Sequence, residues 1–188
     1  AAAEAALKRC GFSVKRAPKG QNMSVSINES NAWGAELHVP IHTNAFDEKT
    51  TGGTMIMVYS NSGENAKAAK AIKAALDPIT PGKDYAIQTR TDLAELRQTT
   101  AIAVYCECEF HDTKEGASFI IANTGKIGEA IAKGICSYYG VKYIAASTGT
   151  AAKAKYYVQI GAYADKSNAE AQVKAAKAKG FDAFIKEL

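Results

Sequence analysis

The sequence predicts an α/β fold in which a mostly parallel sheet carries helices on both faces. Segments with the helical spacing of apolar residues alternate along the chain with short apolar runs that are typical of buried strands. Polar side chains follow two of these runs, residues 37–42 and 101–108. Such alternation is typical of layered domains in which helices cover a sheet.

Length and composition limit the class of protein. A chain of 188 residues is long enough for one domain, or for one domain and a small module. The net charge of +4 comes from Lys and Arg scattered among acidic residues, without the basic patch of a nucleic-acid-binding protein. No apolar run approaches the ~20 residues of a membrane-spanning helix. We therefore expect neither a nucleic-acid partner nor a transmembrane segment.

The cysteines predict no metal site of their own. Cys10, Cys106, Cys108 and Cys136 form neither a C-x-x-C pair nor the tandem spacing of a structural zinc site. Cys106 and Cys108 lie in one apolar run, so they share a strand face and pack as small hydrophobic residues. We expect free thiols.

The first part of the chain predicts helix, strand and helix. Residues 1–9 read as the last turns of a helix without an N-cap, and Gly11 follows its end. Residues 12–17 alternate between apolar and polar side chains, which predicts a strand. Residues 23–33 predict a short helix, with an Asn or Ser side chain available as N-cap.

The middle of the chain supplies the core strands. Residues 37–42 predict a buried strand, and a polar loop with two glycines leads to a second strand over residues 54–59. Residues 61–76 then predict an amphipathic helix with Ala and Lys on different faces.

A break with two prolines and a glycine follows at residues 78–84. Residues 85–97 predict an irregular segment that ends in a short strand over 93–96. Residues 101–108 predict the second strongly apolar strand, and residues 114–139 predict either one long helix or two.

The end of the chain has a different pattern. Residues 144–153 are small and polar, as in a linker. Residues 156–163 predict a strand, and the S-x-x-E motif at Ser167 has the form of a capping box that opens a helix. Residues 181–188 predict a further strand.

Two predicted strands end in side chains that can do chemistry. His38, Pro40 and His42 share one face of the first strand, and only His42 lies where that strand ends. Glu107 ends the later strand, and functional groups in α/β sheets gather at the carboxyl ends of strands. The alternative for His42 is a structural histidine. A catalytic zinc needs three protein ligands and a nearby carboxylate, and these residues alone leave such a site incomplete.

The residues around these two side chains resemble a known family. Residues 31–37 (NAWGAEL), 41–45 (IHTNA) and 52–54 (GGT) resemble the zinc-dependent N-acetylmuramoyl-L-alanine amidases (amidase type 3) of bacterial autolysins and phage endolysins. Residues 107–110 (ECEF) resemble the E-x-G-F block of that family. The resemblance covers most of residues 1–143.

This resemblance implies a function and a cofactor. The implied reaction is hydrolysis of the amide bond between N-acetylmuramic acid and L-alanine of the peptidoglycan stem peptide. His42 would be the last zinc-binding histidine and Glu107 the catalytic glutamate, with Zn²⁺ as cofactor. The first two zinc ligands of the family, a histidine and a glutamate, are predicted upstream of Ala1, so we expect residues 1–143 to be an amidase domain that lacks its N-terminal part.

The resemblance also raises two candidate substrate-binding residues. Asn44 is expected to order the loop beside the site, and Arg97 to contact a substrate carboxylate, although a surface salt bridge is an equal alternative for Arg97. The chain departs from the family at Ser26, where many relatives carry arginine, and at Glu109, which replaces a glycine. On a regular strand Glu109 would share a face with Glu107, which would bring two carboxylates together.

The C-terminal residues 154–188 resemble one half of a SPOR module, a peptidoglycan-binding domain, and we expect a small α+β half-module there after a linker at 144–153. A generic βαβ or ferredoxin-like fragment is the alternative. Peptidoglycan is thus the expected partner of the chain.

Three functional hypotheses remain from the sequence. The first is a peptidoglycan amidase that acts at the bacterial cell wall, after secretion or after release from the cytoplasm on phage lysis. The second is a non-catalytic peptidoglycan-binding protein on an amidase fold with an incomplete zinc site. The third is a generic α/β domain with no connection to the cell wall.

Overall fold

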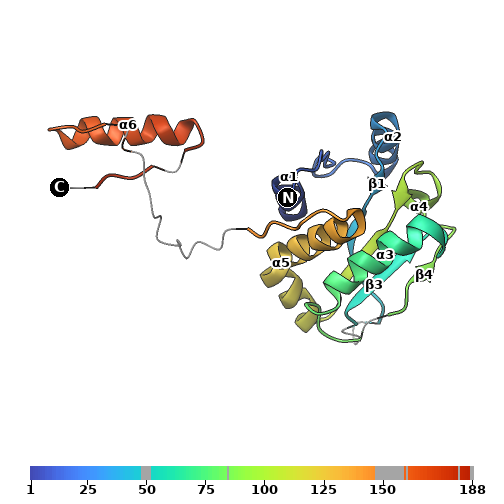
Figure 1. Cartoon of the computed structure of the whole chain (residues 1–188). Helices are drawn as coiled ribbons and strands as arrows, with labels where there is room; N and C mark the ends of the chain where they lie inside the picture. The colour runs from blue at the N-terminus through green and yellow to red at the C-terminus, as the bar shows by residue number, and fades with distance from the viewer. Residues whose placement is uncertain (48–51, 84, 147–158, 160, 182, 187–188) are drawn as a thin grey trace. The chain divides into compact units, whose positions relative to one another are not determined.

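The computed structural model describes residues 1–47, 52–83, 85–146, 159, 161–181 and 183–186. Internal contacts divide the chain into two compact units, residues 1–146 and 147–188. The first unit carries the sheet and the candidate site (Figure 1).

The first unit alternates helices and strands. Its elements are, in chain order, α1 (Ala2–Arg9), α2 (Met23–Trp33), β1 (Leu37–His38), β2 (Ile41–Asn44), β3 (Thr54–Val58), α3 (Gly63–Leu76), β4 (Gln88–Thr89), α4 (Ala94–Arg97), β5 (Ile102–Ala103), β6 (Tyr105–Phe110) and α5 (Lys114–Tyr139).

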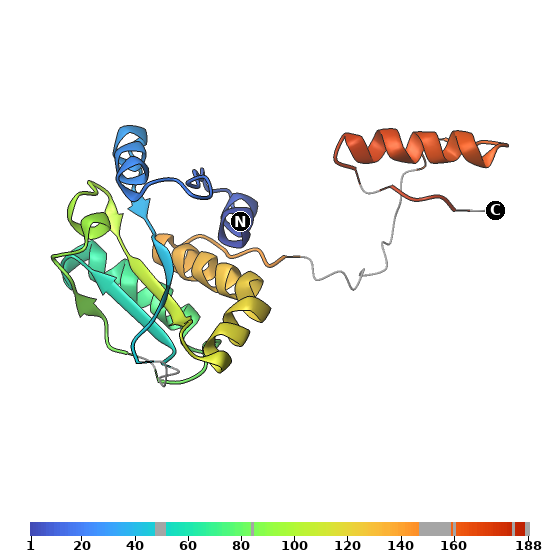
Figure 2. The ribbon, with the colours of Figure 1, turned by 180° about the vertical axis from the view of Figure 1, so that it is seen from behind.

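The sheet is mixed but mostly parallel, as the sequence predicts. Four strands hydrogen-bond in the order β2-β6-β3-β4, and β1 pairs separately with β5. The pairs β1–β5, β2–β6 and β3–β4 are parallel, whereas β3 and β6 are antiparallel. Figure 2 shows these strands from behind.

The strand expected over residues 37–42 is divided into β1 and β2 at Val39-Pro40. The carbonyl groups of Glu36, His38 and Pro40 accept hydrogen bonds from the opposite strands at 3.1, 3.0 and 2.9 Å, so the pairing continues through the division. Proline has no N–H to return, which interrupts the ladder at this point. The side chains still alternate between faces as they would on one strand.

Helices α3 and α5 cover one face of the sheet and pack against each other (Figure 1). The core on this face consists of small and branched apolar side chains: Ile56, Val58, Ala68, Ala69, Ile72, Leu76, Val104, Cys106, Cys108, Ile127, Ala130, Ile131 and Ile135. Gly134 permits the close approach of the two helices, because a Cβ atom there would lie 2.5 Å from the Cα of Ile72. Cys106 and Cys108 are free and buried in this core, as expected.

The other face of the sheet carries a smaller cluster that includes Met57, Leu96 and Ala103, with Leu93 packed against it. Leu96 belongs to α4, so the prediction of a strand over residues 93–96 was wrong. The amide groups of Leu96 and Arg97 both donate to the carbonyl of Leu93, at 3.2 and 3.0 Å, which forms a helical turn. This turn places both leucines on the sheet.

The prediction of a strand over residues 12–17 was also wrong. This segment follows α1 and pairs with no strand. Phe12 instead packs on Tyr139 of α5, with ring centroids 5.5 Å apart. The helix that follows, α2, forms as expected, because the side chain of Asn22 accepts a hydrogen bond from the amide of Ser24 at its start.

The segment after β6 forms one helix with a kink, which combines the two sequence alternatives. Asn123 has non-helical dihedral angles inside α5. Its side-chain amide donates to the carbonyl of Phe119 at 2.9 Å, and such bonds compete with the helical ladder. Gly140 ends α5 in the left-handed conformation, with φ of 66°.

The second unit contains the helix α6 (Lys166–Ala178). Asp165 is the N-cap of α6, so Ser167 lies inside the first turn and the predicted capping box is wrong. Among the described residues of the two predicted strands, namely 159, 161–163, 181 and 183–186, none is in a strand. The rest of those strands and most of the expected linker lie outside the described residues. Within the described part of the chain, no helix is both long and apolar enough to cross a membrane.

Candidate functional site

His42 and Glu107 lie opposite each other on the neighbouring parallel strands β2 and β6. Cys106 and Cys108 point into the core beneath α3 and α5, so the side chain of Glu107 points to the opposite face. His42 shares that face, and the register of the two strands shifts directly after it, between His42 and Asn44. The fold thus places on one face, on neighbouring strands, the two residues that the family resemblance implies as zinc ligand and catalytic glutamate. These two roles stay predictions.

Glu107 is a nearly buried carboxylate. It is 9% exposed, and its Oε2 atom is buried with no hydrogen-bond partner among the described residues. Burial raises the pKa of Glu107, and the positive charges of His42 and His111 offset part of this effect. A carboxylate with a raised pKa and an unsatisfied oxygen is suited to accept and release a proton.

His42 is held on two sides and open on a third. Its Nε2 atom lies 3.4 Å from Oε2 of Glu95, and 45% of its side chain is exposed. Its ring stacks on Tyr105, with centroids 4.5 Å apart and planes inclined by 10°. The hydrogen bond to Glu95 raises the pKa of His42, against the effect of burial.

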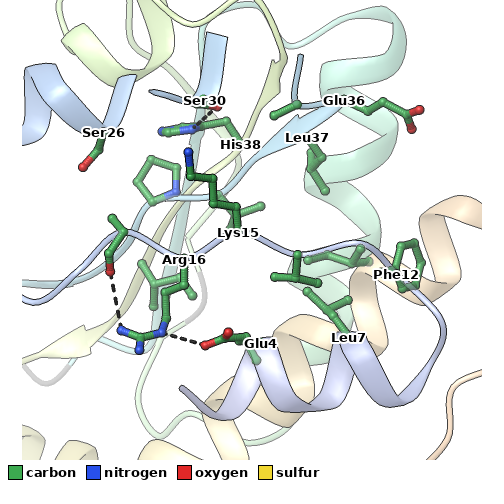
Figure 3. A pocket seen from close by; sticks show the side chains of 18 of the residues that line it. Glu4, Leu7, Phe12, Lys15, Arg16, Ser26, Ser30, Glu36, Leu37 and His38 are labelled. Carbon is green, nitrogen blue, oxygen red and sulfur yellow. Dashed lines mark hydrogen bonds and ion pairs between the residues drawn. The ribbon is translucent and has the colours of Figure 1, made fainter. Parts of the chain in front are cut away.

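Glu95 also approaches His38, the other histidine on this face. The Nε2 atom of His38 lies 3.9 Å from Oε1 of Glu95, and its Nδ1 atom lies 3.0 Å from Oγ of Ser30 (Figure 3). Burial opposes ionisation of Glu95, but the two histidines outweigh it and lower the pKa of Glu95 to about 2.

Glu95 was not among the predicted site residues, because residues 93–96 were expected to form a strand. The signal available was an acidic residue between two leucines at the spacing of one helical turn. Nothing in that pattern indicates that the carboxylate is turned toward His38 and His42.

A cavity of about 920 Å³ adjoins these residues. Leu7 and Phe12 line it on the side of α1, and Leu37 and His38 line it on the side of the strands (Figure 3). His42 and Glu95 also belong to its lining, so the exposed part of the His42 ring can be reached from this cavity.

The two candidate substrate-binding residues occupy different places. Asn44 ends β2, where its Oδ1 atom accepts a hydrogen bond from the amide of Ala45 at 2.9 Å and its Nδ2 atom lies 3.8 Å from the sulfur of Met55. These contacts order the start of the loop beside His42. Arg97 is exposed at the end of α4, the helix that carries Glu95. A substrate role for either residue stays a prediction.

Glu109 does not share the site of Glu107. It has a φ of 97°, which breaks the alternation of the strand. Its buried carboxylate accepts hydrogen bonds from the amides of Gly52, Gly53 and Phe110, each at 3.0 Å. The close contact also requires glycine, since a Cβ atom on Gly52 would lie 2.2 Å from the ring of Phe110. Glu109 therefore fixes the chain that enters β3.

The described residues contain no group of three His, Cys, Asp or Glu side chains that could hold a metal ion. His42 nevertheless has the donor chemistry that zinc prefers, and an unsatisfied carboxylate oxygen lies on the strand beside it. The described site fits part of a zinc centre, with one ligand and an adjacent base.

Comparison with known proteins finds relatives among amidases. The chain is 27% identical over 160 residues to the sporulation-specific N-acetylmuramoyl-L-alanine amidase of Bacillus subtilis (strain 168), covering 84% of this chain and 59% of the relative. It is 28% identical over 168 residues to the N-acetylmuramoyl-L-alanine amidase CwlM of Bacillus licheniformis, covering 87% of this chain and 62% of the relative. The chain thus spans about three fifths of the length of these curated relatives.

Solved structures with the same fold include the catalytic domain of CwlV, an N-acetylmuramoyl-L-alanine amidase from Bacillus (Paenibacillus) polymyxa var. colistinus. Its TM-score is 0.67 at 21% identity, covering 75% of this chain and 80% of that one. The amidase Ami1 of Mycobacterium smegmatis gives a TM-score of 0.64 at 22% identity, covering 74% and 72%. These similarities confirm the predicted α/β fold.

Family models match both parts of the chain. Residues 152–187 match the SPOR domain, as the C-terminal pattern predicts. Residues 2–137 match the N-acetylmuramoyl-L-alanine amidase model and include both His42 and Glu107. The chain belongs to the N-acetylmuramoyl-L-alanine amidase family and carries a SPOR match after its amidase domain.

Proposed function

We propose that this protein hydrolyses the amide bond between N-acetylmuramic acid and L-alanine of the peptidoglycan stem peptide. The observation that carries the proposal is the pairing of His42 with Glu107 on adjacent parallel strands. Both residues lie inside the region that matches the amidase family. Two further observations support the proposal: an oxygen of Glu107 is buried without a hydrogen-bond partner among the described residues, and the residue paired with Glu107 on the neighbouring strand is a histidine.

We further propose that the cofactor is zinc and that His42 supplies one of its ligands. A catalytic zinc takes three protein ligands, so other donors must complete the coordination around His42. A bound zinc would supply Lewis-acid activation of water and of the amide carbonyl. His42 binds through a neutral ring nitrogen, which its contacts with Glu95 and Tyr105 hold in a defined orientation.

Glu107 is the proposed general base and acid. Its carboxylate takes a proton from the attacking water and gives a proton to the nitrogen of the departing L-alanine. Burial raises its pKa, which favours the first of these transfers, because a carboxylate with a raised pKa is a stronger base. The net reaction consumes one water and leaves a carboxylate on the lactyl group and a free amine on the peptide.

We propose that the C-terminal unit binds peptidoglycan, on the basis of its SPOR match. A binding unit joined to a hydrolase raises the local concentration of enzyme on an insoluble polymer. Its proposed place of action is therefore the bacterial cell wall, which the protein would reach by secretion or by release from the cytoplasm on phage lysis.

Removal of metal is expected to abolish hydrolysis, and zinc is expected to restore it. The measurement is the release of stem peptides from purified peptidoglycan by the protein after treatment with a chelator, then with added zinc. His42→Ala is expected to lower the affinity for zinc, measured by competition with a chromogenic chelator. Cys136→Ser is the control. Cys136 is a buried free thiol of α5, the helix that covers the opposite face of the sheet, so we expect its loss to leave zinc uptake unchanged.

A protein that hydrolyses the substrate fully without metal would contradict the zinc proposal. A protein that takes up no zinc and cleaves nothing, but is retained on peptidoglycan, would favour the alternative of a non-catalytic binding protein on an amidase fold. The two measurements therefore separate the amidase from the non-catalytic binding protein.

A further inference from the structure

Glu95 lies between two histidines on one face of the sheet. Its Oε2 atom is 3.4 Å from Nε2 of His42, and its Oε1 atom is 3.9 Å from Nε2 of His38. Residues 38 and 42 share a face because side chains alternate along β1 and β2. The carboxylate reaches both rings from α4, which lies over the same face.

The helix that carries Glu95 is fixed to the sheet. Leu96, the next residue, is buried in the cluster with Met57 and Ala103. The side chain of Glu95 is itself only 12% exposed. A carboxylate that is this strongly buried needs a polar or charged partner, and the ring of His42 is the nearer of the two imidazoles, at 3.4 Å. The position of the carboxylate is therefore determined by packing.

The His42 ring is limited in two independent ways. Stacking on Tyr105, with planes inclined by 10°, sets the plane of the ring. The contact with Glu95 sets which ring nitrogen faces the carboxylate, and this nitrogen is Nε2. A neutral imidazole that donates from Nε2 carries its lone pair on Nδ1, the atom that can then bind a metal.

We propose that Glu95 is a positioning residue that holds His42 in the Nε2–H form and leaves Nδ1 free as the zinc ligand. The inference rests on the proposed function, since it assigns the orientation of the proposed zinc ligand. Histidine ligands in metal sites commonly donate their second N–H to a carboxylate, and loss of that partner costs about 10- to 100-fold in metal affinity. His38 supports the arrangement, because its bond to Ser30 fixes the ring that faces the other oxygen of Glu95.

The test compares Glu95→Leu and Glu95→Gln with the unmodified protein. Leucine removes the acceptor at similar volume, whereas glutamine retains one acceptor oxygen. Glu64→Leu is the matched control, because Glu64 is exposed on α3, which covers the opposite face of the sheet. Thermal unfolding of each variant checks that it is folded.

The first readout is the tautomer of His42 in the metal-free protein, measured by ¹⁵N NMR at a pH where the ring is neutral. We expect the Nε2–H form in the unmodified protein, in Glu95→Gln and in Glu64→Leu, and a mixture of the two forms in Glu95→Leu. An Nδ1–H form in the unmodified protein, or the same tautomer in Glu95→Leu, would overturn the proposal.

The second readout is zinc affinity by chelator competition. We expect Glu95→Leu to weaken zinc binding by about 10- to 100-fold, Glu95→Gln by less, and Glu64→Leu not at all. Unchanged affinity in Glu95→Leu would overturn the positioning role. If the unmodified protein takes up no zinc, the proposed function fails. The tautomer measurement then still tests whether Glu95 determines which ring nitrogen of His42 carries the proton.

Discussion

Replacing Glu107 with Gln is expected to reduce amide hydrolysis by about 10²- to 10⁴-fold, the usual loss when a general acid–base group is removed. Glutamine keeps the shape of the side chain but cannot accept the proton of the attacking water. The measurement is the rate of release of stem peptides from purified peptidoglycan at saturating zinc. Activity within a few fold of the unmodified protein would exclude Glu107 as the base.

The same substitution is expected to stabilise the fold at neutral pH. The pKa of Glu107 is raised in the folded protein, so the ionised carboxylate disfavours the folded state when the pH lies above that pKa. The stability gain of Glu107→Gln should therefore shrink as the pH falls through the folded pKa toward 4.5, the ordinary value. Urea unfolding at several pH values measures the gain.

A control substitution tests whether the effects of Glu107→Gln on hydrolysis and stability would follow from the loss of any acidic residue. Glu64→Gln changes an exposed carboxylate on α3 that bonds to Lys67 and Tyr138. We expect it to leave hydrolysis unchanged. A variant of Glu107 that is both inactive and less stable at neutral pH would indicate a structural role in place of a catalytic one.

Replacing Glu109 with Ala is expected to destabilise the amidase domain by about 3–5 kcal/mol. The buried carboxylate satisfies the amides of Gly52, Gly53 and Phe110, and each buried amide left without a partner costs about 1–3 kcal/mol. Alanine also keeps the unfavourable backbone conformation, with φ of 97° at this position. Urea unfolding measures the loss.

Glu109→Gly separates the two causes. Glycine also removes the carboxylate but adopts a positive φ without strain, so it should be more stable than Glu109→Ala by about 1–2 kcal/mol. The family resemblance places glycine at this position, which agrees with the backbone conformation seen here. Equal stability of the Ala and Gly variants would show that the positive φ at position 109 does not affect the free energy of unfolding. If both variants were as stable as the unmodified protein, the stabilising role of the Glu109 carboxylate would be refuted.

The sequence was informative where a local pattern has one structural meaning. The apolar runs before His42 and Glu107 predicted two core strands, and the structure pairs those strands side by side. The predicted strand ends were wrong, because β2 continues past His42 to Asn44 and β6 continues past Glu107 to Phe110. Residues 12–17 show the opposite case. Their alternation fits a strand, but a strand also needs a partner, and alternation alone does not reveal whether one is present.

Glu95 and Glu109 could not be placed from the sequence for physical reasons. The position of Glu95 depends on the packing of α4 against the sheet, which is a tertiary effect. The position of Glu109 depends on a positive φ, which a glutamate does not signal. In both cases the side chain is buried by contacts with residues that are distant in the chain.

The most direct test of the proposed amidase activity is to identify the bond that the protein cleaves in purified peptidoglycan. Mass spectrometry of the products, together with labelling of free amino groups, distinguishes the possible bonds. We expect zinc-dependent release of peptides with a free N-terminal L-alanine and of glycan strands that keep intact lactyl groups. Products with new reducing sugar ends, cleavage within the stem peptide, or no products in the presence of zinc would contradict it.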